Sequence, residues 1–327
     1  MVGADGGSTA PRYAIAGQFT ANGTANLSGF YDSDLYGSLP VSDQTLSSSD
    51  LSAVSASTGR GTFTITFNGS NAEHSTLSFV FYVVSASELL LMEDDVAGYS
   101  LLTGRVLQQS GTFTDASLDG IGVFEIESLN LGTTASATAG LLTTTGNSGT
   151  FTLSADQNLG GTLSTLSESG TYSTSANGRV VLTISGEANP PVLYLIAPNQ
   201  AFVVGTDLGV TSGVIEPQSG SNFSNSSLTG AYLGGSFQPV DASVNEEVDD
   251  LQANGSGTFT GTSDQNGTGG TATSSISETY AVSSNGRVVV SQSGSQVGIL
   301  YLISDSEFVL LPVSTADTNP ALGEFLH

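Results

Sequence analysis

The sequence predicts an all-β protein of three tandem antiparallel units, each an eight-strand meander closed into a small β-barrel. Short segments of β-branched and aromatic residues alternate with Gly, Asn, Asp and Ser, which is typical of strands joined by tight turns. One order of phrases recurs, since "SANGRV" at 175–180 returns as "SSNGRV" at 283–288. No apolar pattern of helical period interrupts the strands. A β-sandwich is the alternative, because both architectures use short antiparallel strands.

The repeat divides the chain into unit 1 at residues 1–109, unit 2 at 110–219 and unit 3 at 220–327. A glycine opens the closing phrase of every unit. Closure into a barrel is expected because it leaves no unpaired edge strand. In unit 3 the predicted strands lie near 228–238, 245–253, 256–264, 274–283, 287–293, 297–304, 307–313 and 322–327.

Unit 1 is predicted to lack its opening strand. It has no counterpart of "SLDGIGVFEIES" in unit 2 or of "SLTGAYLGGSF" in unit 3. A barrel without this strand exposes two strand edges and a groove, which a strand from another chain can fill by β-augmentation. Alternatively, the boundary marks where a longer chain was cut. The first eleven residues, MVGADGGSTAP, are too polar and glycine-rich to supply the strand.

Three of the five basic residues, Arg60, Arg179 and Arg287, stand at the same point of the repeat. Asn-Gly precedes two of them, which predicts a type I′ hairpin turn with positive φ at both residues. Odd positions after each arginine, Phe63 and Phe67 among them, are predicted to face and fill the core, so the arginines face solvent. We expect carboxylates from neighbouring strands or the adjoining unit to hold the arginines, in preference to a bound anion.

The composition excludes several classes of partner. The chain has 5 Lys and Arg against 30 Asp and Glu, a formal charge of −25, and neither Cys nor Trp. Without a basic patch, binding to nucleic acid or to anionic membranes is not expected. No apolar run is long enough for a membrane span. An acidic, lysine-free sequence rich in Ser, Thr and Gly favours an extracellular location, at the cell surface.

Oxygen-rich segments follow the third predicted strand of each unit, at 32–37, 156–161 and 264–270. Alternating oxygen ligands that end in glycine are typical of part of a calcium loop, and Asp32 and Asp34 are the best Ca²⁺ candidates. A Ca²⁺ site needs six or more oxygens, which none of these segments supplies locally. Turns in which Asp and Asn side chains bond to the backbone account for the same residues.

No motif predicts catalysis. His74 and His327 are the two histidines, and neither repeats. No GxSxG nucleophile turn occurs, and no glycine-rich phosphate loop follows a strand. The acidic run at 245–250 is expected to be a solvated edge strand. We therefore expect a protein without enzymatic activity, catalytic residues or a cofactor.

The order of "FSNSSLTGAY", "GTYSTSANGR", "YLIS", "FVLL" and "GVIEPQ" resembles the tandem all-β repeats of about 100 residues in very large secreted bacterial surface proteins. The resemblance covers residues 13–327. It implies an extracellular, repetitive protein with no enzymatic activity.

Two functions are expected from these observations. In the first, the chain is a structural surface protein whose units build a stalk or filament, assembling by β-strand complementation through self-association or with other surface proteins. In the alternative, it is an adhesin or a β-barrel binding module for a glycan or a small apolar ligand.

Overall fold

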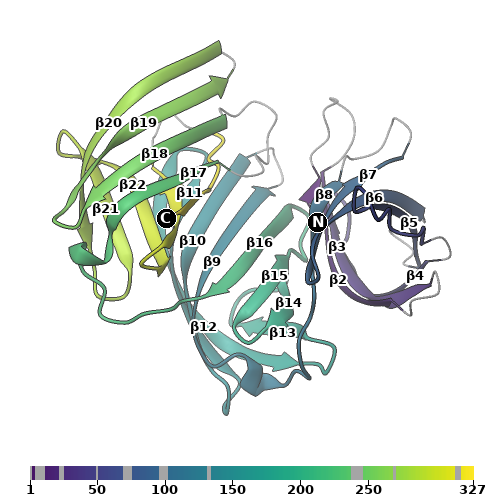
Figure 1. Ribbon diagram of the computed structural model, residues 1–327. Coiled ribbons are helices and arrows are strands. Elements are labelled where there is room, and N and C mark those ends of the chain that lie inside the picture. Colours follow the sequence, from purple (N-terminus) through teal and green to yellow (C-terminus); the bar gives the residue numbers. More distant parts are fainter. Residues whose placement is uncertain are drawn as a thin grey trace. The chain divides into compact units, whose positions relative to one another are not determined.

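The computed structural model describes residues 2–3, 12–21, 26–48, 51–68, 76–95, 102–130, 134–236, 246–267, 270–313 and 318–327. These residues form three antiparallel sheets, and each sheet closes on itself as a barrel (Figure 1). The all-β prediction is confirmed, and the β-sandwich alternative is wrong because the sheets close. Within the described residues, helical structure is limited to two three-residue 3-10 turns, η1 (Asp115–Ser117) and η2 (Asn225–Ser227).

Strands follow one another around each barrel in sequence order, because short connections bring sequence neighbours into antiparallel pairs. The first barrel contains β1 (Val2–Gly3), β2 (Tyr13–Ala21), β3 (Leu27–Leu35), β4 (Val41–Ser48), β5 (Arg60–Phe67), β6 (Thr76–Ser85), β7 (Glu88–Glu93) and β8 (Leu102–Leu107). The second contains β9 (Gly120–Asn130), β10 (Thr134–Thr145), β11 (Thr150–Leu159), β12 (Thr162–Thr174), β13 (Arg179–Ile184), β14 (Val192–Ala197), β15 (Gln200–Val204) and β16 (Val210–Pro217). The third contains β17 (Thr229–Ser236), β18 (Glu246–Asn254), β19 (Thr258–Gly267), β20 (Gly270–Val282), β21 (Arg287–Gln292), β22 (Ser295–Ser304), β23 (Glu307–Pro312) and β24 (Gly323–Leu326).

The eight strands predicted for the third repeat are confirmed, and their ends differ from the prediction by a few residues. One detail of that prediction is wrong. The acidic run at 245–250 is not an edge strand, because β18 pairs with β17 on one side and β19 on the other. Asp249 of this run is buried.

Contacts along the chain group it into two compact units. Residues 1–118 and 171–212 form the first unit, and residues 119–170 and 213–327 form the second. The first unit contains the first barrel with β13, β14 and β15, and the second contains the third barrel with β9, β10 and β11.

Alternate residues of the strands fill the lumen of the first barrel. In β5, Phe63, Ile65 and Phe67 are buried while the residues between them are partly exposed, so the predicted phase after Arg60 is confirmed. The ring centroids of Phe63 and Phe79 lie 5.3 Å apart in a stacked arrangement. The buried side chains of this lumen are Tyr13, Ile15, Leu27, Tyr31, Val41, Leu46, Phe63, Ile65, Phe67, Leu77, Phe79, Phe81, Leu91 and Leu102.

The lumen of the third barrel is also aromatic. Phe308 stacks on Phe325 with ring centroids 4.9 Å apart, and Phe259 lies 4.5 Å from Tyr280. The Tyr280 hydroxyl donates to the carbonyl of Leu228 at 2.9 Å, which ties the turn η2 to the barrel wall. A buried tyrosine needs such an acceptor, because an unpaired hydroxyl in an apolar core costs free energy.

The hairpin turn before Arg179 differs from the predicted type. Gly178 has a φ of 88°, whereas Asn177 does not have a positive φ. Gly178 N donates to Ser175 O at 2.8 Å, and Ser175 N donates to Arg179 O at 2.8 Å. This is a type I turn followed by one left-handed glycine. The hairpin is confirmed and the type I′ prediction is wrong; the turn before Arg287 repeats the same bonds.

The first barrel has seven long strands and a two-residue opening strand, whereas the sequence predicted that this strand is absent and that the first eleven residues cannot supply it. β1 consists of Val2 and Gly3, which pair with β2 on one side and β8 on the other. Among the described residues, nothing else pairs between these two strands, so residues 15–21 of β2 and 104–107 of β8 are paired on one side only. Within the described residues, only Val2 and Gly3 occupy the position that β9 and β17 fill in the other barrels, and this position is called the slot.

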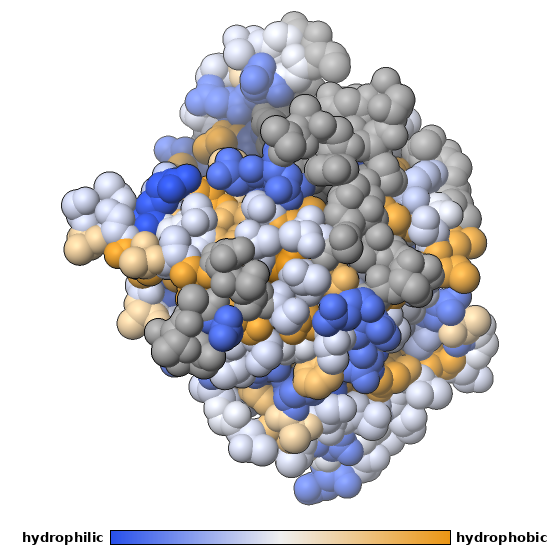
Figure 2. Space-filling model, turned by 90° about the vertical axis from the view of Figure 1, so that its right-hand side faces the viewer, coloured by the Kyte–Doolittle hydropathy of each residue, from blue (hydrophilic) through white to orange (hydrophobic). Residues whose placement is uncertain are grey.

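The surface mixes hydrophobic and hydrophilic residues. Figure 2 shows hydrophobic areas on one face of the molecule separated by hydrophilic ones. None of the described residues belongs to a helix with the length and hydrophobicity needed to cross a lipid bilayer.

Candidate functional site

The repeated arginines are positioned by their turns and by a tyrosine on the next strand. In the first unit, Asn177 Oδ1 accepts a hydrogen bond from Arg179 N at 3.2 Å, which fixes the start of β13. Arg179 and Tyr194 stand directly opposite each other on β13 and β14. Directly opposed residues of a sheet project from the same face, so both side chains leave the outer wall of the barrel together.

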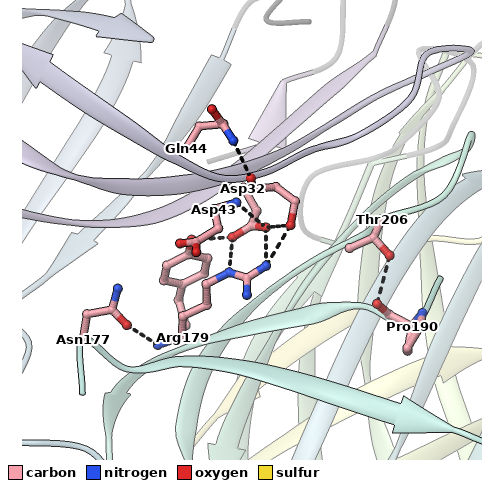
Figure 3. A network of polar contacts seen from close by, with 9 residues as sticks. Asp32, Asp43, Gln44, Asn177, Arg179, Pro190 and Thr206 are labelled. Carbon is pink, nitrogen blue, oxygen red and sulfur yellow. Dashed lines mark hydrogen bonds and ion pairs between the residues drawn. The ribbon is translucent and has the colours of Figure 1, made fainter. Parts of the chain in front are cut away.

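Asp32 of the first barrel receives this pair (Figure 3). Arg179 Nε donates to Asp32 Oδ2 and Arg179 Nη2 to Asp32 Oδ1, both at 2.7 Å. The Tyr194 hydroxyl donates to Asp32 Oδ2 at 2.5 Å. Ser42 Oγ and Asp43 N, from β4, also donate to Asp32 Oδ1, at 2.9 and 3.1 Å. The carboxylate is thus saturated by donors, in the forked geometry that arginine makes best.

The contact is buried, which determines its electrostatics. The Arg179 side chain is 11% exposed and that of Asp32 is 1% exposed. Burial raises the pKa of Asp32, but the hydrogen bonds from Arg179 and Tyr194 outweigh it, so the pKa lies below its usual value. Burial and the adjacent Asp32 charge raise the pKa of Tyr194, which keeps its hydroxyl protonated and able to donate. The predicted solvent exposure of Arg179 is therefore wrong, although its outward direction is right.

The second unit contains the same contact at the next repeat. Arg287 Nε donates to Asp156 Oδ2 at 2.6 Å and Arg287 Nη2 to Asp156 Oδ1 at 2.9 Å. The Tyr301 hydroxyl donates to Asp156 Oδ2 at 2.6 Å. Asp156 lies in β11 of the second barrel, while Arg287 and Tyr301 lie in β21 and β22 of the third. The prediction that carboxylates of neighbouring strands or of the adjoining repeat hold the arginines is confirmed for Arg179 and Arg287, and in both cases the carboxylate belongs to the preceding barrel.

An apolar cluster surrounds the contact in the second unit. Tyr301 packs there with residues from the outer walls of the second and third barrels, and all are buried. The cluster consists of Val123, Ala137, Ala139, Leu141, Ile299, Tyr301, Ile303, Val309, Leu311, Val313 and Leu322. Exclusion of water by these side chains strengthens the charge-assisted bonds beside them.

A glutamine in each connector supports the turn that carries the arginine. Gln109 Nε2 donates to Asn177 O at 2.9 Å and to Leu195 O at 2.6 Å. In the second unit, Gln218 makes the corresponding bonds to Asn285 O at 3.1 Å and to Leu302 O at 2.7 Å. The connector between barrels is thereby joined to the same hairpin that presents the arginine.

The residue two positions after the acceptor aspartate differs between the two contacts. Asn158, two residues after Asp156, donates through Nδ2 to Pro312 O at 2.9 Å. Asp34, two residues after Asp32, accepts from Thr211 N through Oδ2 at 2.9 Å, and its buried Oδ1 has no partner within the described part of the chain. Burial raises the pKa of Asp34 to about 7, and the charge of Asp207 adds to the shift.

The predicted Ca²⁺ candidates therefore have other surroundings than a calcium loop. Asp32 and Asp34 lie inside β3, so the predicted loop at this point is wrong. Both oxygens of Asp32 are bound by protein donors. Across the described ranges, no group of three or more His, Cys, Asp or Glu side chains is arranged to hold a metal ion. His74 lies outside the described residues.

Four glutamates gather near the contact in the second unit. Glu125 lies in β9 and Glu324 in β24, and the two carboxyl groups interact. Burial raises the pKa of Glu125 well above its usual value, and the charges of Glu324, Glu127 and Glu216 raise it further. Glu127 Oε1 also accepts from Leu322 N at 2.8 Å.

A cavity of about 550 Å³ lies in the first unit beside the incomplete opening strand. Consecutive residues of both strand edges line it, 15–21 of β2 and 105–107 of β8. Phe63, Ile65 and Phe67 form part of its wall, so the cavity reaches the lumen and the predicted complete filling is not reached here.

Sequence reasoning identified the arginines but missed their acceptors. Tyr194 and Tyr301 recur at nearly the same spacing as the arginines, and "ADQN" at 155–158 returns as "SDQN" at 263–266. The joint recurrence of the arginine, the tyrosine and the aspartate at matching points of the repeat is the signal that could have linked them. Arg60, in contrast, is exposed, and no described acidic side chain contacts it.

Comparison of the chain with models of known protein families and with curated proteins finds no match.

Proposed function

We propose that the chain is a non-enzymatic structural protein of the cell surface, in which the barrels are building blocks of a stalk or filament. The observation that supports this role is the buried contact between a carboxylate of one barrel and the arginine and tyrosine of the next, made twice with the same geometry. Removal of one partner from such a pair, with the other still enclosed, costs about 3–5 kcal/mol, so the enclosed geometry requires both halves. The contact therefore acts as a stiff joint.

Small-angle scattering tests the joint. Arg179→Ala is expected to increase the radius of gyration and the maximum dimension of the chain, while far-UV circular dichroism stays unchanged because each barrel has its own core. Arg60→Ala is the matched control, because Arg60 occupies the same point of the repeat without an acidic partner. Identical scattering curves for wild type and Arg179→Ala would show that the contact does not fix the barrels.

The extracellular part of the proposal rests on composition and on the resemblance to secreted repeat proteins. A charge of −25 with no lysine or cysteine suits a protein that stays soluble without chaperones or disulfides. Immunogold labelling of intact cells of the producing organism tests it, and labelling confined to permeabilised cells would refute it.

We propose further that the open slot of the first barrel is completed by a β-strand of another polypeptide. Among the described residues, the backbone edges at 15–21 and 104–107 offer unpaired hydrogen-bonding groups on both sides of the slot, and apolar side chains form the larger part of the cavity lining between them. In the equivalent slots, β9 and β17 show the kind of occupant that fits.

A small apolar ligand or a glycan is the alternative occupant, which would make the chain a binding module or adhesin. The volume of about 550 Å³ and the apolar wall favour a small apolar molecule over a glycan. Displacement of a bound hydrophobic dye separates the cases, since a fatty-acid-like competitor releases it from a ligand site and a strand peptide releases it from a strand slot.

A further inference from the structure

The contact between barrels has two halves, and the chain carries three copies of each. Strand register identifies the copies of the basic half, because Arg60 is paired with Tyr82, Arg179 with Tyr194 and Arg287 with Tyr301. Register also identifies the acidic half, because Asp32, Asp156 and Asp264 are paired with Ala16, Ala139 and Val248. The two contacts described above use the basic halves of the second and third barrels and the acidic halves of the first and second barrels. The basic half of the first barrel and the acidic half of the third barrel are not used in either contact.

The remaining basic half has the composition of a contact surface but is exposed. Tyr82, Val84, Leu90 and Met92 project from β6 and β7 and are 47–55% exposed. The residues at the same register positions in the third barrel are at most 7% exposed. Those buried counterparts are Tyr301, Ile303, Val309 and Leu311.

The remaining acidic half is exposed in the same way. Leu233 and Val248 are 63% and 59% exposed, whereas Val123 and Ala139, their counterparts in the second barrel, are at most 2% exposed. Asp264 is exposed and accepts a hydrogen bond from Thr273 of the next strand at 2.5 Å. It therefore has the register of Asp156 without an arginine.

The two remaining faces are complementary in charge. Arg60, Tyr82, Leu90 and Arg105 form one row across β5, β6, β7 and β8, since each is paired with the next. This row holds two of the five basic residues of the chain; Arg105 is ion-paired with Glu88 at 3.0 Å, so Arg60 supplies the uncompensated charge of the row. On the acidic half, the exposed Asp250 stands where the second barrel has the buried Leu141. Opposite charges on two faces favour their encounter and oppose pairing of either face with itself.

We propose that these faces bind each other between two copies of the chain, so that Asp264 of one copy accepts the fork of Arg60 and the hydroxyl of Tyr82 from the next. The proposal rests on the building-block role, because it extends the internal joint to the ends of the chain. The contact joins two different faces, so each bound copy leaves one face of each kind for the next. Such head-to-tail contacts produce filaments unless the rotation between copies closes a ring.

Sedimentation velocity with the full chain tests the proposal. Wild type is expected to form species larger than a dimer as its concentration rises towards about 1 mM. Arg60→Asp and Asp264→Arg are each expected to weaken association at least about tenfold. Glu168→Arg is the matched control for Asp264→Arg, because it makes the same charge change at an exposed position of β12 outside both faces. Unchanged melting temperatures show that the variants fold.

A mixture of the two variants gives the decisive result. Arg60→Asp keeps an intact acidic face and Asp264→Arg keeps an intact basic face, so the native contact can form between them, and the two substituted faces also carry opposite charges. We expect each variant to be monomeric alone and the mixture to regain association. Wild type that stays monomeric, variants that associate like wild type, or a mixture that stays monomeric overturns the proposal. None of these results changes the scattering of a single chain, which tests the building-block role separately.

Discussion

Arg60, Arg179 and Arg287 follow equivalent turns and start equivalent strands, yet their surroundings differ. Arg179 is almost fully enclosed, the Arg287 side chain is 30% exposed, and Arg60 is exposed. Asp156 accepts hydrogen bonds from its arginine and its tyrosine. Asp32 accepts the equivalent bonds and two more, from Ser42 and Asp43. The same side chain should therefore contribute differently to stability at each repeat.

Alanine substitutions measure this difference. We expect Arg179→Ala to lower the free energy of unfolding by about 3–5 kcal/mol, because the substitution leaves the buried Asp32 charge without its partner. Arg287→Ala should cost less, because water reaches this site more easily. Arg60→Ala should cost almost nothing. Urea unfolding of the three variants checks the order, and equal losses at Arg60 and Arg179 would contradict it.

Asp34 provides a pH-dependent test. Its pKa of about 7 in the folded protein exceeds the unfolded value of about 4, so the folded state binds the extra proton between these limits. The contribution of Asp34 to stability is present at low pH and is lost as the pH rises through 7. Asp34→Asn should therefore stabilise the protein by about 1–3 kcal/mol at pH 8 and change it little at pH 4. Asp32→Asn should destabilise at both values.

The sequence permits prediction of the arginines but not of their acceptors. Alternation after Arg60 predicts the inward direction of Phe63, because that periodicity is local to one strand. The acceptor of Arg179 lies 147 residues away and is one of thirty acids, so no local rule selects it. Burial of Arg179 is likewise invisible, because the outer wall of a barrel reads as a solvent face until another barrel covers it.

At the scale of elements, strand order could be predicted well because each strand is bounded by its own turn residues. The turn type could not, since an Asn-Gly pair fits both a type I′ turn and a type I turn followed by a left-handed glycine. The strand structure of residues 32–35 was also not predicted. Asp and Asn at the end of a strand have the composition of a loop, and their partners are not visible in the sequence.

The glycine that precedes Arg179 links the hairpin to the connector. A Cβ at Gly178 would lie 2.5 Å from Gln109 Nε2, at a φ of 88°. Gly178→Ala should therefore cost the left-handed strain of about 1–2 kcal/mol and also weaken the bonds of Gln109. Gly186→Ala is the control, because Gly186 has a φ of 91° with nothing within 4 Å. Equal losses in thermal unfolding would show that the glutamine contributes nothing.

The open slot of the first barrel should accept a peptide with the sequence of an opening strand. A synthetic peptide of residues 224–236, which carries β17, is expected to bind the full chain and raise its melting temperature. In its own barrel β17 pairs with β18 and β24, and the peptide should pair in the same way with β2 and β8. The same peptide with proline in place of Tyr232 lacks a donor and should not bind. Calorimetric titration decides, and equal affinity of the two peptides would exclude strand pairing.

At the scale of the whole molecule, the protein should be most stable on the acid side of neutrality. The raised pKa values of Glu125, Asp34 and Asp249 mean that stability falls as the pH rises from about 5 towards 8. Below about pH 4 the lowered pKa of Asp32 acts in the other direction, since protonation removes its charge. Scanning calorimetry from pH 3 to 8 checks this curve, and Glu125→Gln should flatten its neutral limb.

Because each joint uses the same three side chains at the same register, the order of the barrels carries little information about which of them can be neighbours. Unequal crossing-over within the gene could remove or add one repeat, and the new neighbours would still find matching partners. Related strains should then differ in chain length by whole barrels.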